Sequence, residues 1–331
     1  MSVNQATIRT YASSANFLGI YDHAGIKVSG HNGSGLYIET TASKSRMPGL
    51  QIQSTGSVSV PTDSKNLAHK IAASLFSDYN NKIDLCESGL ILTINNNLKK
   101  GGLGTSAASA VAFVELLDKL YELKLTPEQK IFYASLAEPD QHLDNVLPCV
   151  LGGIVFSYRP EDGQSVPYHR FAPPSNLFPV LIVPLDIKKV GGTQGAKNAI
   201  KYLVHTADEK QRISKLKESA IQGVTSSDFQ VLRKVAIEFL SWKRSETFLR
   251  NQERVYGVDI IAINRFLEKR YGRKVIFTPS GAGPAALVQA EDPDTANRAA
   301  EDVADDYRVG FHNALVVPAS IRNQGSIDDF V

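Results

Sequence analysis

A glycine-rich loop between a strand-like segment and an apolar helix is the part of this sequence best suited to chemistry. The segment Gly89–Ile94 leads into the run Asn97-Leu-Lys-Lys-Gly-Gly-Leu-Gly-Thr-Ser-Ala-Ala-Ser-Ala110. Glycines let the backbone approach a ligand closely, and the amides at a helix N-terminus attract anions. Thr105 and Ser106 supply hydroxyls at the helix start for a phosphate or its magnesium ion, and Lys100 supplies positive charge nearby. The pattern therefore predicts a phosphate-binding loop.

Two known nucleotide-binding patterns can be compared with this loop. The run Gly102-x-Gly-x-x-Ala107 satisfies the dinucleotide fingerprint, but that fold needs a second parallel strand ending in an acidic residue about 20 residues later. Here the helix predicted over 105–123 is followed by Thr126-Pro-Glu128, which is typical of the start of another helix. A Walker A loop also fails, because no Gly-Lys-Ser/Thr follows at the required spacing. One alternative stays open, a turn capped by Thr105 with a small-residue helix packed behind it and no ligand.

The composition is that of an ordinary globular enzyme. The chain has 331 residues, of which 43% are hydrophobic and 21% charged, with a formal net charge of +2. This balance, without a long Lys/Arg run, argues against nucleic-acid binding. No apolar stretch approaches the roughly 18 residues of a membrane span, and the N-terminus lacks a secretory pattern. Cys86 and Cys149 are far apart and indicate a reducing compartment, so we expect a cytoplasmic protein without a membrane partner.

The order of predicted elements indicates an α+β protein, and its length suggests two domains. Short alternating segments in the first 60 residues are typical of strands, and a helix is predicted over 66–79. Residues 160–179 are rich in Pro, Gly and Ser and mark the expected domain boundary. Beyond it we expect a strand, helices, two strands, a helix and a final strand.

Four segments resemble those of the GHMP small-molecule kinases, and most of all the homoserine kinases. They are Ala12-Ser-Ser-Ala-Asn16 with Tyr21-Asp22 and Gly25, Gly102-Leu-Gly-Thr-Ser-Ala-Ala-Ser109, His142-Leu-Asp-Asn-Val-Leu-Pro-Cys-Val-Leu-Gly-Gly153, and Ser280-Gly-Ala-Gly-Pro284. They occur in the family's order over nearly the whole chain. The resemblance implies the two-domain GHMP kinase fold, with a ribosomal protein S5 domain 2-like N-terminal domain over 1–165 that binds ATP and a ferredoxin-like C-terminal domain over 175–331.

The resemblance also implies a site for ATP and Mg²⁺. The loop amides would hold the phosphates, Asn66 would lie near the adenine, and Ser106 with a nearby glutamate, taken as Glu138, would hold the metal. A solvated position in a Glu-Pro turn is the alternative for Glu138. The nucleotide-binding residues implied in this way are Asn66, Lys100, Gly102, Leu103, Gly104, Thr105, Ser106 and Ala107.

The acceptor site implied by the resemblance suits an amino acid with a hydroxyl group. Asp22 would pair with the ammonium group, and Asn145 would orient the hydroxyl. Asp144 would act as general base, with Asn145 and Ser106 as the other catalytic residues. Positioning without a base is the alternative, as is a turn in which Asp144 and Asn145 bond only their own backbone. The acceptor-binding residues are expected to be Asn16, Asp22, His142, Asn145, Lys197, Arg254, Ser280 and Gly281.

Two departures from the homoserine kinase pattern concern the acceptor carboxylate. The family is expected to clamp it with two arginines, whereas Lys197 stands at the first position and Arg254 is only a loose match for the second. A lysine is a point charge rather than a bidentate fork. We expect phosphorylation of L-homoserine to O-phospho-L-homoserine, a step of threonine biosynthesis. The alternatives are a kinase for mevalonate, a sugar or another hydroxy amino acid, and a catalytically silent sensor. The oligomeric state is left open, and a homodimer is compatible with the sequence.

Overall fold

The computed structural model describes most of the chain. The residues described are 4–31, 35–80, 82–83, 89–98, 101–138, 143–158, 167–185, 206–244, 249–250, 253–254, 259–281, 283–306 and 313–331. Three residues predicted to belong to the site, Lys100, His142 and Lys197, therefore lie outside the described part.

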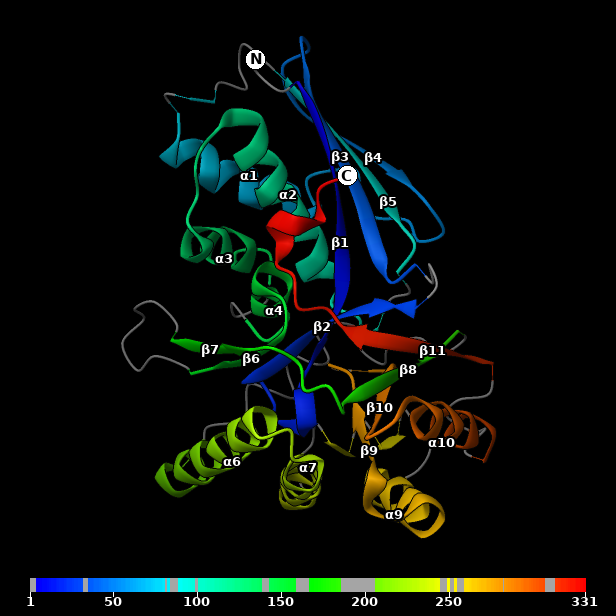
Figure 1. Cartoon of the computed structure of the whole chain (residues 1–331). Helices are drawn as coiled ribbons and strands as arrows, with labels where there is room; N and C mark the ends of the chain where they lie inside the picture. Colours follow the sequence, from blue (N-terminus) through cyan, green and yellow to red (C-terminus); the bar gives the residue numbers. More distant parts are fainter. Residues whose placement is uncertain are drawn as a thin grey trace.

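The N-terminal half is a sheet covered on one face by helices (Figure 1). The sheet runs in the order β4-β5-β3-β1-β2, antiparallel except for the pair β4–β5. Helix α2 lies in the middle of the helical layer and is buried on most of its surface, which suits a helix rich in alanine and leucine. The elements are β1 (Gln5–Ala15), η1 (Phe17–Gly19), β2 (Ala24–Gly30), β3 (Tyr37–Ser45), β4 (Gly49–Thr55), α1 (Leu67–Asp78), β5 (Gly89–Asn96), α2 (Thr105–Tyr121), α3 (Pro127–Ser135), α4 (Val146–Leu151), β6 (Ile154–Ser157) and β7 (Tyr168–Phe171).

The C-terminal half is an antiparallel sheet packed against helices. Its strands lie in the order β11-β8-β10-β9, and their succession along the chain is strand, helices, two strands, helix, strand. This is the expected ferredoxin-like pattern. The elements are β8 (Phe178–Pro184), α6 (Ala207–Thr225), α7 (Phe229–Lys243), α9 (Ile260–Tyr271), η4 (Gly272–Lys274), β9 (Val275–Pro279), β10 (Ala286–Ala290), α10 (Pro293–Asp306), β11 (Ala314–Ile321) and η5 (Ser326–Asp329).

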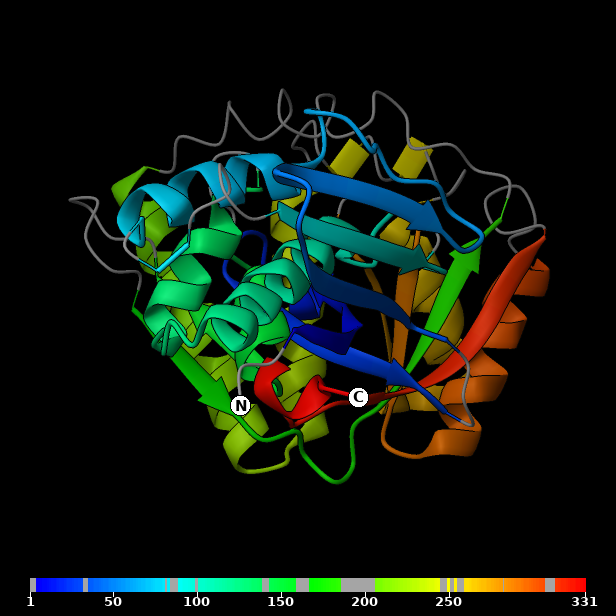
Figure 2. The same ribbon diagram turned by 90° about the horizontal axis from the view of Figure 1, so that it is seen from above.

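Strand β11 joins the two halves into one sheet. Its residues 314–318 pair with β8, and residues 319–321 pair with β2 of the N-terminal half. The chain then turns back through η5 and ends beside β1, where the Val331 amide donates to the Thr7 carbonyl. In Figures 1 and 2 this red segment lies against α2, α4 and β1. Backbone pairing therefore connects the halves at two places.

Most of the predicted elements are confirmed, and the local signals account for them. Thr126 caps α3 in a reciprocal capping box with Gln129, as its sequence pattern indicated. Helix α2 is followed by α3 rather than by a strand, which agrees with the rejection of the dinucleotide fold. The prediction missed β7, which lies inside the stretch interpreted as a linker and pairs with β6. The division into domains at 1–165 and 175–331 stays a prediction.

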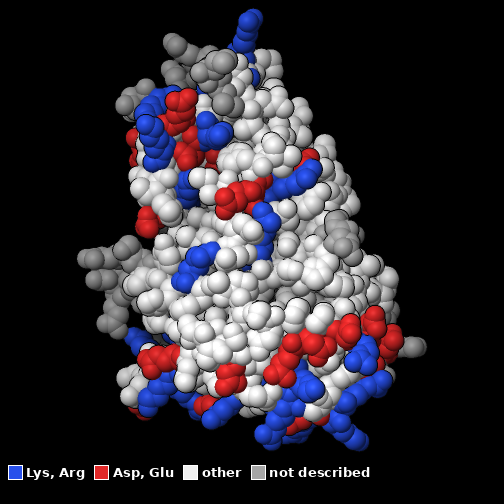
Figure 3. Space-filling view, in the orientation of Figure 1, with Lys and Arg blue, Asp and Glu red and all other residues white. Residues whose placement is uncertain are grey.

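The surface of the described residues shows mixed charge. On the face drawn in Figure 3, Lys and Arg are interspersed with Asp and Glu over the upper and lower parts of the molecule, with broad uncharged areas between them. Among the described helices, none combines the length and the apolar character that crossing a membrane requires.

Lys217 on α6 is a buried cation held by a carbonyl group and an aromatic ring. Lys217 is only 4% exposed. The Nζ donates to the Ser157 carbonyl at 3.2 Å and lies 3.8 Å from the centroid of the Tyr158 ring. Burial lowers the pKa of Lys217 to about 8, because these neutral groups do not replace the hydration of an ammonium ion.

We expect Lys217 to make the stability of the protein depend on pH in the alkaline range. Between about pH 8 and pH 10.5 the unfolded chain keeps a proton on Lys217 that the folded chain has released, so the free energy of unfolding rises with pH across this window. Lys217→Met should lose this rise and be more stable near pH 7 by on the order of 2 kcal/mol, reduced further by any solvent screening. Urea unfolding at several pH values measures both effects.

The exposed Lys215 on the same helix provides the matched control, because Lys215→Met removes a charge without changing a buried site. An unchanged pH dependence in Lys217→Met would contradict the assignment.

Candidate active site

The glycine loop follows β5 and ends where α2 begins. Gly101, Gly102 and Gly104 all have positive φ, at 116°, 91° and 60°. Gly104 is the N-cap of α2 and has no side chain with which to cap it, so the first amides of the helix have no side-chain acceptor at that position. Thr105 is the first helical residue rather than the cap, and the alternative of a turn capped by Thr105 is wrong in this respect. An uncapped helix N-terminus is a binding site for an anion.

The hydroxyls at the start of α2 support this interpretation. Thr105 Oγ1 is buried and has no hydrogen-bond partner among the described residues. It lies in the first turn of α2, where a bound anion would be its partner. Ser106, the next residue, is half-buried in the same first turn.

The Ser280–Pro284 turn supports the loop from behind. Ser280 is fully buried, and its Oγ donates to the Gly102 carbonyl at 2.5 Å and lies 2.8 Å from Ser14 Oγ. The Ala285 amide donates to the Gly101 carbonyl at 3.2 Å. A Cβ added to Gly102 would lie 2.3 Å from the Ser280 carbonyl oxygen. The loop thus needs glycine because its own protein support leaves no room for a side chain.

Asn16 fastens the same turn to the first strand. It has positive φ at 61°, its Nδ2 donates to the Gly281 carbonyl at 3.1 Å, and its Oδ1 accepts from the Asp22 amide at 3.2 Å. The Gly281 amide in turn donates to the Ala15 carbonyl at 3.1 Å. The structure therefore brings together Asn16, Asp22, Ser280 and Gly281, four residues of the predicted acceptor set.

The Asp144–Asn145 turn lies directly beside the start of α2. Asn145 is the N-cap residue of α4, and its Oδ1 accepts a hydrogen bond from Ser13 Oγ at 2.9 Å. A Cβ added to Gly104 would lie 1.9 Å from that Ser13 Oγ and 2.9 Å from Asn145 Oδ1. Asp144 is 6% exposed, and its carbonyl oxygen would lie 1.8 Å from a Cβ on Gly25. The amide predicted for catalysis is thus adjacent to the predicted phosphate loop, and Asp144, the preceding residue, is buried with its backbone against Gly25.

Three comparisons with known proteins bear on this arrangement. The family model for the GHMP kinases N terminal domain matches residues 66–153, which include the loop, α2 and the Asp144–Asn145 turn. Over residues 66–153 the chain is therefore similar to the N-terminal domain of these kinases. A homoserine kinase of Methanopyrus kandleri is 28% identical over 258 residues, which cover 74% of this chain and 78% of that protein.

Solved structures show that the whole chain has the GHMP kinase fold. The structure of homoserine kinase from Cytophaga hutchinsonii matches with a TM-score of 0.70 and 19% identity, covering 98% of this chain and 96% of that one. An L. major mevalonate kinase matches with a TM-score of 0.63 and 16% identity, covering 98% and 100%. These identities carry the fold alone. Together the comparisons confirm the predicted GHMP kinase resemblance and fold, and they support the interpretation of the chain as a kinase.

Glu138 lies three residues after the end of α3. It is half-buried, and its amide donates to the Ser135 carbonyl. Burial raises the pKa of the Cys149 thiol to about 11, and the charges of Asp329 and Glu138 add to the rise. The function of Glu138 as a metal ligand stays a prediction.

Asn66 and Arg254, two further residues predicted for the site, make no contact with the glycine loop that the structure shows among its described residues. Asn66 caps α1, where its Oδ1 accepts from the Ala68 amide at 3.0 Å and its Nδ2 donates to the Pro61 carbonyl at 2.6 Å. Its amide group therefore has a structural function, and contact with an adenine stays a prediction. Arg254 is exposed.

Sequence reasoning missed Ser13 and Ser14, whose side chains connect the first strand to the two turns that flank the phosphate loop. Ser13 bonds Asn145, and Ser14 contacts Ser280. Both are fully or almost fully buried in β1. Their position directly before Asn16, inside the first motif, was the available signal.

Gly104→Ala should disrupt this site far more than backbone strain explains, because the new Cβ would displace Ser13 from Asn145. We expect at least a 10-fold loss of ATP affinity, measured by calorimetry. Gly272→Ala is the matched control, since Gly272 has φ of 66° but nothing within 4 Å of an added Cβ. Equal ATP affinities for the two variants would contradict the packing argument.

Proposed function

We propose that this protein transfers the γ-phosphoryl group of ATP to the side-chain hydroxyl of L-homoserine, with Mg²⁺ as the metal ion. GHMP kinases use ATP, and the sequence relative described above is named a homoserine kinase. The observation that carries the proposal is the open N-terminus of α2, with its unpaired Thr105 hydroxyl, beside the Asp144–Asn145 turn. Such a site suits a polyanion next to groups that can orient an alcohol.

The residues present fit a magnesium ion. Mg²⁺ prefers oxygen ligands and is commonly bound by one or two side chains together with substrate phosphates. The Ser106 hydroxyl in the first turn of α2 is an oxygen donor of this kind, and the half-buried Glu138 carboxylate is the proposed second ligand. An ion held there would neutralise charge that develops on the transferred phosphoryl group.

In this proposal the protein acts mainly by binding and orienting its substrates. The amides of residues 102–107 hold the phosphates, and Asn145, itself fixed by Ser13, orients the acceptor hydroxyl. The hydroxyl oxygen bonds to the γ-phosphorus as the bond to the β–γ bridging oxygen breaks, and ADP leaves. The proton of the hydroxyl passes to the Asp144 carboxylate. Correct positioning supplies most of the rate in such a reaction.

The specificity for the acceptor depends on the residues proposed to bind its ammonium and carboxylate groups. Asp22 would bind its ammonium group from the turn that Asn16 holds. Arg254, expected to bind the carboxylate, is exposed, which favours a second candidate function, phosphorylation of a small alcohol without a carboxylate such as a sugar. Lys197 and His142 complete the proposed set.

Assays with a panel of alcohols test the substrate. Purified protein with Mg-ATP should release ADP in the presence of L-homoserine and form O-phospho-L-homoserine, identified by mass spectrometry. Turnover of R-mevalonate, galactose or L-serine without turnover of L-homoserine would reject this acceptor in favour of another. Ser106→Ala should lower kcat at least 10²-fold through loss of a metal ligand, whereas Ser109→Ala, one turn further along α2, should stay within about threefold.

Asp144→Asn tests whether a general base is used. Removing a base lowers kcat by roughly 10²–10⁴-fold, and the KM for ATP should change little because the phosphate loop is intact. A decrease of less than about 10-fold would show that positioning suffices. Steady-state kinetics on variants with unchanged circular dichroism measure the difference.

A further inference from the structure

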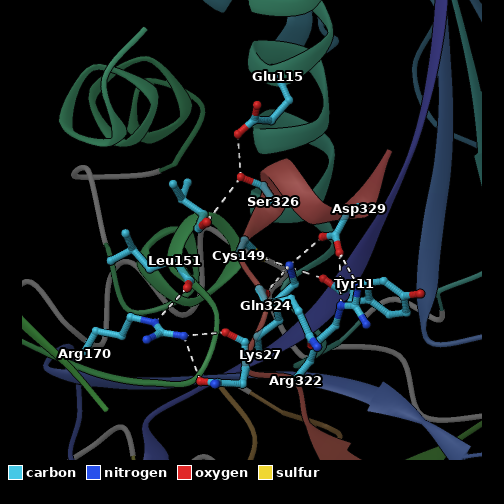
Figure 4. Close-up of polar contacts among 12 residues, drawn as sticks. Tyr11, Lys27, Glu115, Cys149, Leu151, Arg170, Arg322, Gln324, Ser326 and Asp329 are labelled. Carbon is cyan, nitrogen blue, oxygen red and sulfur yellow. Dashed lines mark hydrogen bonds and ion pairs between the residues drawn. The ribbon is translucent and has the colours of Figure 1, made fainter. Parts of the chain in front are cut away.

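The last ten residues form a clasp that returns from the C-terminal half into the N-terminal half. This C-terminal clasp, residues 322–331, runs past the C-terminal end of α4 and the middle of α2 (Figure 4). Gly153 donates its amide to the Arg322 carbonyl at 2.8 Å, and a Cβ on Gly152 would lie 2.4 Å from the Gln324 carbonyl oxygen. The contact is therefore between backbones, without intervening side chains.

A buried ion pair anchors the clasp. Lys27 Nζ on β2 lies 2.5 Å from Asp329 Oδ2, and both side chains are fully buried. Arg322 binds the other carboxylate oxygen through Nε at 3.0 Å and Nη2 at 2.9 Å. Removing one member of such a group is strongly destabilising, because a buried charge is left without its partner. Arg322 precedes the short helix η5 and Asp329 is its last residue, so this ion pair fixes the position of the helix.

Ser326 in η5 connects the two helices that lead to the proposed active site. Its Oγ donates to Glu115 Oε1 of α2 at 2.5 Å and lies 3.3 Å from the Val150 carbonyl oxygen of α4. Lys130 binds the second oxygen of Glu115 at 2.8 Å and so holds that carboxylate in place. Ser326 and Glu115 are almost completely buried.

The N-terminal ends of α2 and α4 also lie close together, at the proposed active site. Helix α2 begins at the phosphate loop, about 15 Å from Glu115 at 1.5 Å per residue, and α4 begins at Asn145, about 8 Å from Val150. At these ends Ser13 Oγ donates a hydrogen bond to Asn145 Oδ1, and both atoms lie beside Gly104. The helices are thus joined at the site by Ser13 and away from it by Ser326.

We infer that Ser326 is a positioning residue, which sets the distance between the phosphate loop and the Asp144–Asn145 turn by joining α2 to α4. This inference rests on the proposed phosphoryl transfer, in which the loop holds the donor and the turn orients the acceptor. A displacement of about 1 Å between the two costs rate, since the reacting atoms must be aligned, but it leaves each binding surface intact. Loss of Ser326 should therefore lower kcat and leave the KM for ATP unchanged.

The test compares Ser326→Ala with Ile327→Ala. Ile327 is 67% exposed in the same turn and is the control for a change in η5 itself. At a temperature well below unfolding, Ser326→Ala should lower kcat about 10-fold or more, with the KM for ATP within about twofold of the wild type. Ser326→Cys, which keeps a weak donor of similar size, should be intermediate and remains informative if the alanine variant does not fold. Wild-type kcat in both Ser326 variants, or an equal decrease in Ile327→Ala, would overturn the inference.

Hydrogen exchange separates this inference from the proposed function. The amides of residues 144–147 should exchange faster in Ser326→Ala than in the wild type or Ile327→Ala, whatever the acceptor is. If another alcohol proves to be the substrate, the kinetic comparison is made with that alcohol. If no acceptor is phosphorylated, the proposed function fails, and unchanged exchange at 144–147 would by itself reject the positioning role.

Discussion

The phosphate loop depends on close packing of its glycines against two distant parts of the chain. Added Cβ atoms would lie 2.2 Å from Pro284 at Gly101, 2.3 Å from the Ser280 carbonyl at Gly102 and 1.9 Å from Ser13 at Gly104. A side chain at these positions would displace its neighbours, and the positive φ at each position adds strain for any residue other than glycine. One side of the loop is thus filled by the protein, and its amides at the start of α2 remain for an anion.

This constraint explains why both halves of the molecule are needed for one site. The loop and α2 belong to the N-terminal half, but Ser280, which binds the loop carbonyl, belongs to the turn between β9 and β10. The pairing of β11 with β2 and the C-terminal clasp hold the two halves in a fixed position relative to each other. A loop whose shape is fixed in advance loses little conformational freedom when it binds its ligand.

Buried charges have two different consequences in this fold. Asp329 is compensated by Lys27 and Arg322 and holds the clasp in place, and Glu115 is compensated by Lys130 and Ser326. Lys217 is bound by a carbonyl group and the Tyr158 ring, and its burial outweighs the attraction of the Glu218 charge, so its own charge is disfavoured. The first kind adds specificity to the packing of distant segments, whereas the second reduces stability at neutral pH.

The sequence alone determined the features that depend on local signals. The glycine run, the capping box at Thr126 and the alternating strands are written in consecutive residues, and their elements are confirmed. Tertiary structure decided the rest. It directed the Ser280 hydroxyl at the loop, and paired Ser13 with Asn145 and Ser326 with Glu115. Ser13 and Asn145 are 132 residues apart in the sequence, and Ser326 and Glu115 are 211 residues apart. Only folding brings these partners within hydrogen-bond distance, so no local pattern marks them.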